Sequence, residues 1–136
     1  MRIALSTALA VMLLAPLANA APSGCQDAQG QDRKAILDAL RAPVSASLNA
    51  PVEFHVERIR VCGDWAFALA TPQNPGGGEM RWAGTPCDGD TSHLAGGLMR
   101  RNGTGWALID SALCPSDVAW ADWPDRYHVP QILFDE

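Results

Sequence analysis

Between residues 52 and 73 the chain carries two runs in which apolar and polar side chains follow a strand period. In the first run Val52, Phe54 and Val56 alternate with polar residues, as in a strand with one buried face. The apolar parity shifts by one residue at 57–58, and we expect a β-bulge there because a bulge returns later side chains to their face. Residues 62–64, Cys-Gly-Asp, predict a tight turn into a second strand.

The second strand predicts the position of a helix. It carries Trp65, Phe67 and Leu69 on one face and only alanines on the other, which leaves room for a helix to lie close. Residues 31–41 repeat small apolar side chains at helical spacing, so we expect them to form that helix. Pro43 is expected to end the helix, because a residue before proline avoids the α region.

The remaining pattern completes an α+β fold. Further strands are expected at 79–83, 93–101 and 105–112, the last two joined by a hairpin at Asn102-Gly103. A short helix is expected at 117–122, ended by Pro124, with the C-terminal tail wrapping back over the domain. The predicted fold is one N-terminal helix packed on a four- to five-stranded antiparallel sheet, with a short C-terminal helix and tail.

The first twenty residues predict that the protein is exported from the cytoplasm. Arg2, an apolar run and an Ala18-Asn19-Ala20 cleavage site form a signal peptide over 1–20. We expect a flexible tether at 21–30, a single domain at 31–136 and no membrane span. The mature protein is expected to be periplasmic or secreted; the alternative is a lipoprotein acylated at Cys25.

The net charge limits the classes of binding partner, and the cysteine content predicts disulfides. The whole chain has a formal net charge of −5, and removal of Arg2 makes it one unit more negative, which argues against nucleic acid as a partner. Four cysteines in an exported chain indicate two disulfides, for which three connectivities exist. The predicted strand order favours Cys62–Cys87 together with Cys25–Cys114.

Candidate chemistry is sparse in this sequence. His93 with Asp110 or Asp117 could support acid–base work, but no pattern fixes the geometry that such chemistry requires. The histidines and cysteines lack ligand spacing, so no metal site and no cofactor are predicted. Trp65 and Trp106 are expected in the core, whereas Trp82, Trp120 and Trp123 are the candidates for an exposed binding surface.

Two short motifs carry a resemblance. Gly63-Asp64-Trp65-Ala66-Phe67 and Ser116-Asp117-Val118-Ala119-Trp120 resemble motifs of a group of small exported bacterial proteins of unknown function. The order of elements is similar to cystatin-like and NTF2-like folds, a likeness that assigns no function.

Three functional hypotheses follow. The first is a non-catalytic, disulfide-stabilised domain that binds another protein or an envelope component. The second is an NTF2-like small-molecule binder or enzyme with a pocket between helix and sheet, into which His55, His93 or Asp110 would point. The third is an inhibitor that presents the loop at 73–78 to an enzyme cleft.

Overall fold

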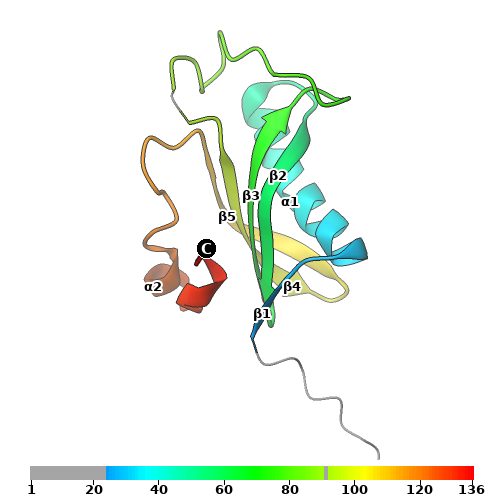
Figure 1. Cartoon of the computed structure of the whole chain (residues 1–136), viewed down its shortest axis with the longest axis vertical. Coiled ribbons are helices and arrows are strands. Elements are labelled where there is room, and N and C mark those ends of the chain that lie inside the picture. The colour runs from blue at the N-terminus through cyan, green and yellow to red at the C-terminus, as the bar shows by residue number, and fades with distance from the viewer. Residues whose placement is uncertain (1–23, 91) are drawn as a thin grey trace, which may run out of the picture.

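A computed structural model describes residues 24–90 and 92–136, so the predicted signal peptide lies outside the described residues. The fold is α+β, as the sequence predicts. The strands are β1 (Cys25–Asp27), β2 (Glu53–Cys62), β3 (Trp65–Gln73), β4 (Ala95–Asn102) and β5 (Gly105–Leu113), and they form one antiparallel sheet in this order. Helix α1 (Gly30–Leu48) covers one face, while α2 (Trp123–Tyr127) and the 3-10 turn η1 (Gln131–Leu133) lie on the other (Figure 1).

The β2–β3 hairpin has the predicted turn and bulge. The register passes from Val56 directly to Arg58, so Glu57 is the extra residue of the bulge. Gly63 in the turn has a φ of 59°, a conformation that glycine adopts without steric cost. The bulge keeps the apolar side chains of β2 on one face on both sides of Glu57.

The face of the sheet under α1, called here the helix face, is closely packed. Ala66, Ala68 and Ala70 are fully buried there, as the alanine pattern predicts. A Cβ built on Gly97 of β4 would lie 2.9 Å from Cδ1 of Leu40 on α1. The helix therefore approaches the sheet as closely as side chains allow, and apolar side chains occupy the space between them.

Helix α1 runs past Pro43, and the expectation that Pro43 ends it is wrong. The buried residues of α1 are Ile36, Leu40, Val44 and Leu48, one apolar stripe with a four-residue spacing. A proline inside a helix costs about 3 kcal/mol, because it removes a donor and crowds the preceding turn. Burial of Val44 and Leu48, roughly 1.5–3 kcal/mol each, offsets that cost.

Two further expectations about elements are wrong. Residues 79–83 form no strand but belong to a loop, from which Met80 enters the helix-face core with 6% exposure. Their apolar pattern reflects packing without strand pairing, and β3 pairs directly with β4. At the N-terminal side, Cys25–Asp27 is not a tether but strand β1, paired with residues 60–62 of β2.

The opposite face of the sheet, called the tail face, is covered in part by the C-terminal segment (residues 115–136, the tail). Buried side chains of the tail cover Phe67 and Leu98: these are Trp123, Val129, Leu133 and Phe134. The helix lies at Trp123–Tyr127 rather than 117–122, and Pro124 stands in its first turn, where a missing N–H costs nothing.

Two arginines of β2 fasten the tail to the sheet. Arg58 donates from Nη1 to the carbonyl of Asp135 at 2.9 Å and from Nη2 to that of Phe134 at 3.0 Å. Arg60 donates to the carbonyl of Ile132 at 2.9 Å and also to that of Asp135. Backbone carbonyls that no helix or strand satisfies thus gain charged donors.

The disulfides are Cys25–Cys62 and Cys87–Cys114, so the predicted connectivity is wrong. It depended on a strand at 79–83 that would have carried Cys87 to the end of the sheet where Cys62 lies. Because β4 pairs with β3 instead, Cys114 lies at the opposite end of the sheet. There the backbone N–H of Cys114 donates to the carbonyl of Leu94 at 2.8 Å.

Candidate functional site

The three tryptophans expected at the surface do not form a common surface. Trp123 is 2% exposed and lies in the tail-face core, so its interpretation as an exposed aromatic is wrong. Trp120 is partly buried, with its ring 5.5 Å from that of Phe67. Trp82 is also partly buried and packs against the helix-face core, on the other side of the sheet.

The two tryptophans expected in the core differ in burial. Trp106 is buried as expected, whereas Trp65 is only partly buried.

His93 stacks on Trp82. Their ring centroids lie 4.2 Å apart and the rings are inclined by 12°. The loop that carries Trp82 is held by Thr85, whose hydroxyl donates to the Trp82 carbonyl at 2.6 Å. This contact places two predicted site residues together, and it explains the position of His93 as packing.

Asp110 is engaged elsewhere. Its carboxylate accepts from the hydroxyl of Tyr127 at 2.5 Å and from the N–H of Ser111 at 2.8 Å, with Arg126 at 3.6 Å. The hydrogen bond to Asp110 raises the pKa of Tyr127, because ionisation of the phenol would break that bond. Asp110 fastens α2 to β5 in this way.

His93 and Asp110 do not form an acid–base pair. Asp110 pairs in register with Leu98, five residues along the chain from His93. At about 3.3 Å per extended residue, the two positions are separated by roughly 16 Å along the sheet. The distance is too large for a direct proton transfer between them.

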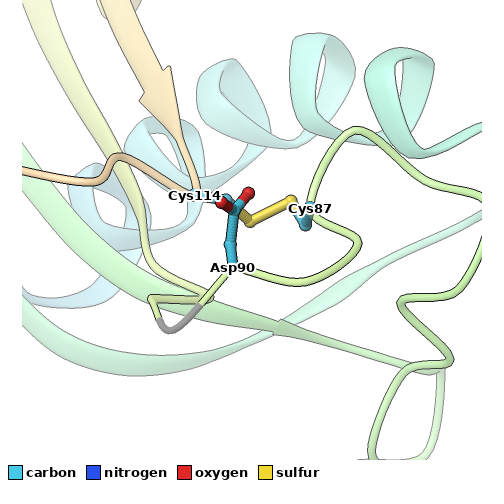
Figure 2. Close-up of side chains that lie close together, drawn as sticks. All are labelled: Cys87, Asp90 and Cys114. Atoms are coloured by element: carbon cyan, nitrogen blue, oxygen red, sulfur yellow. A yellow bond between two sulfur atoms is a disulfide. The ribbon is translucent and has the colours of Figure 1, made fainter.

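One cluster of potential ligand atoms surrounds the second disulfide. Sγ of Cys87, Sγ of Cys114 and a carboxylate oxygen of Asp90 lie within 4.8 Å of one another (Figure 2). The sulfurs are joined to each other, as the yellow bond shows, whereas a metal would require thiolates. In its oxidised form this cluster is a buried crosslink with an acidic neighbour.

The tail face retains an apolar groove beside the tail. A hollow of about 460 Å³ is lined by Leu69, Leu94 and three charged residues, namely Glu57, Arg58 and Glu136. A second hollow, of about 240 Å³, adjoins it at Leu94 and is lined by residues 115–118 and Trp120. We call the two together the tail-face groove. Val118, at its far wall, is 53% exposed, which is high for a large apolar side chain.

Three of the four charged side chains around this groove are acidic. Arg58 directs its guanidinium to the carbonyls of the tail, as described above. Glu57 and Glu136 border the first hollow and Asp117 borders the second, all exposed to solvent. The groove therefore combines an apolar floor with a negative rim.

Sequence reasoning missed the residues of the tail-face groove. Leu69 stands on the strand face predicted to carry Trp65 and Phe67, and the tail was expected to wrap back over the domain without a stated extent. Leu94 lies between His93 and Ala95, and no strand period assigns it to a face. No local pattern in the sequence shows which part of the sheet the tail covers, and in the structure Leu69 and Leu94 line the hollows beside it.

Comparisons with known proteins add no identity. No known family matches the chain, and neither a curated protein nor a solved structure matches it. The likeness to small exported bacterial proteins, and to cystatin-like and NTF2-like folds, stays a prediction. Within the described ranges 24–90 and 92–136, no helix has the length and apolar character needed to cross a membrane.

Proposed function

We propose that this protein is an exported, non-catalytic binding module whose tail-face groove takes an extended segment of a partner protein. The observation that carries the proposal is the groove itself, with an apolar floor at Leu69 and Leu94 and an acidic rim. Two disulfides fit an oxidising compartment outside the cytoplasm. An envelope component of another kind is an outcome that the test below distinguishes.

The chemistry of the groove favours one class of segment. Leu69, Leu94 and Val118 suit an apolar anchor, because removing apolar surface from water supplies most of the affinity at such sites. Glu57, Glu136 and Asp117 suit lysine or arginine beside that anchor, since opposite charges speed encounter and select the partner. The expected segment is extended, apolar at its centre and basic at its flanks.

The alternative of a pocket between helix and sheet gains no support from the packing. Leu40 lies against β4 at Gly97, and the helix-face core is filled by buried apolar side chains. His93 contacts Trp82, and Asp110 contacts Tyr127. Neither residue lines the tail-face groove.

Site-directed photo-crosslinking in the source cell tests the proposal. A photoreactive side chain at Val118 should crosslink one protein, whereas the same side chain at Lys34, on the exposed side of α1, should not. A synthetic peptide of the crosslinked segment should then bind the purified protein and lose at least about tenfold in affinity with Leu94→Asp, because a buried carboxylate removes the apolar anchor site.

Matched charge variants complete the test. Glu57→Lys should weaken the same peptide more than Glu79→Lys, which changes the net charge equally on a loop outside the groove. Equal crosslinking from Val118 and Lys34, or a peptide indifferent to Leu94→Asp, contradicts the proposal. A crosslinked lipid or polysaccharide in place of a protein contradicts the partner class.

A further inference from the structure

The outer edge of β2 is paired along only part of its length. Strand β1 covers residues 60–62, and the N–H of Ala28 then donates to the carbonyl of Ile59 at 3.0 Å. At Gly30 the chain turns away into α1. Among the described residues, no other strand pairs with β2 on this side between residues 53 and 57.

The direction of the free backbone groups follows from the register. In an antiparallel strand, side chains on one face belong to residues whose N–H and C=O point to the same edge. Ile59 has its side chain on the helix face and its carbonyl toward β1, so helix-face residues of β2 direct their backbone outward. The bulge at Glu57 keeps Val56 and Phe54 on the helix face, and their N–H and C=O groups therefore point to the free edge.

The surface beside this edge has room for another chain. A hollow of about 370 Å³ lies where β1 ends, lined by residues 27–29, Arg33 and residues 56–59. It continues the line that β1 begins along β2. Glu57 and Arg58 line both this hollow and the tail-face groove, so the two surfaces meet at the bulge.

The charges along the edge select among possible occupants. Glu53 and Glu57 are exposed and flank His55 on the tail face. Pairing with a second copy of this chain, antiparallel about His55, would place Glu53 opposite Glu57 of that copy at both ends, and like charges directly opposite are destabilising. On the helix face, Arg41 lies at the same edge, with its guanidinium carbon 5.7 Å from the ring centroid of Phe54. Lysine or arginine at alternate positions of an incoming strand therefore fits on the tail face, where it meets both carboxylates favourably.

We infer that the outer edge of β2, from Phe54 to Glu57, binds an extended basic segment of another polypeptide by antiparallel strand addition. The incoming strand continues β1 and satisfies the outward N–H and C=O groups of Phe54 and Val56. Its residues opposite Phe54 and Val56 make the hydrogen bonds, and its intervening residues carry the basic side chains toward Glu53 and Glu57. The inference stands on the free edge and does not require that the tail-face groove be occupied.

A pair of N-methylated peptides tests this directly. The probe is the acetylated, amidated hexapeptide Lys-Val-Lys-Val-Lys-Val, titrated into the purified oxidised protein and followed by NMR. Methylation of the valine amides, which face β2 in the proposed register, should weaken binding about tenfold, because two or three hydrogen bonds are lost. Methylation of the lysine amides, which face solvent, should leave the affinity within about twofold. Both peptides have the same charge, so general attraction to an acidic protein cannot separate them.

Amide hydrogen exchange supplies the matching readout on the protein. In the free protein the amides of Phe54 and Val56 should exchange quickly and that of His55 slowly, since His55 pairs inward with Thr71. The unmodified peptide should slow the exchange of Phe54 and Val56, and a Leu94→Asp variant should respond in the same way. Equal affinity for the two methylated peptides, or no slowing at Phe54 and Val56, overturns the inference while leaving the groove proposal to its own test.

Discussion

The two faces of the sheet are held by different forces. On the helix face, α1 lies against fully buried alanines and against Gly97, and apolar packing dominates. Few polar contacts join α1 to the sheet there: the indole N–H of Trp106 donates to Asp32 at 3.0 Å, and Arg101 lies 3.5 Å from the same carboxylate. On the tail face, an aromatic cluster around Phe67 accounts for part of the contact, but the tail is also fastened by arginine–carbonyl bonds and by Tyr127 to Asp110. One face is closed along its length, whereas the other has open hollows at Leu69 and Leu94.

This difference in packing gives the two faces different roles: the helix face stabilises the fold, and the tail face has room to bind a partner. A helix set against small side chains buries its stripe without voids, and close packing of this kind makes a face rigid. A tail held by individual polar bonds leaves hollows between its attachment points, and those hollows lie beside Leu69, Leu94 and the bulge at Glu57. We therefore expect changes on the helix face to affect the whole fold and changes on the tail face to act locally.

Leu40→Ala is the change with the largest expected effect. Leu40 is fully buried between α1 and the sheet, and loss of such a side chain costs about 2–5 kcal/mol because a cavity remains. Denaturant unfolding followed by far-UV circular dichroism and by tryptophan fluorescence should show one shifted transition, the same for both probes. Lys34→Ala on the exposed side of α1 is the control and should change the free energy of unfolding by less than about 0.5 kcal/mol. Separate transitions for the two probes would show that the helix face does not hold the fold together.

Arg58→Met should have a smaller and more local effect. The change removes two hydrogen bonds to the carbonyls of Phe134 and Asp135, a loss of about 1–3 kcal/mol. Release of the tail should speed carboxypeptidase digestion from Glu136 and alter the fluorescence of Trp123, while the far-UV transition moves little.

Arg33→Met is the matched control for the tail. Arg33 is an exposed arginine on α1, so its removal takes away the same charge without touching the tail. Its digestion rate should equal that of the unchanged protein. If Arg58→Met is digested no faster than Arg33→Met, the tail is held by its apolar contacts alone.

The same contrast explains which parts of the fold the sequence predicts. The alternation in β2, the alanines of β3 and the stripe of α1 are local periods, and each has the predicted structure. The end of α1 was predicted wrongly because burial of Val44 and Leu48 outweighs the local preference of Pro43. The strand expected at 79–83 was wrong because Met80 packs into the core without pairing, and the disulfide assignment failed with it.

The candidate site was harder to predict than the fold. Trp123 lies among polar residues in the sequence, yet it is buried because its ring packs edge-on against Phe67 and Phe134. Leu69 and Leu94 are ordinary apolar residues whose exposure depends on the path that the tail takes over the sheet. The open edge of β2 depends on the point at which β1 ends, and no sequence period encodes that point.

The smallest expected effect tests the polar fastening of α2. The chain has a single tyrosine, so absorbance at 295 nm titrates Tyr127 alone. Its hydroxyl donates to Asp110, which raises its pKa above the ordinary value of 10.0. Because the raised value belongs to the folded state, the contribution to stability is present below pH 10 and is lost as pH rises through the folded pKa, where the unfolded chain has already ionised. The native titration should therefore have its midpoint above that of the unfolded protein, and Asp110→Asn should lower it because the carboxylate acceptor is gone. If the native and denatured midpoints coincide, Tyr127 is not bonded to Asp110 in solution, and the tail face is held by its arginines and aromatic contacts without this third attachment.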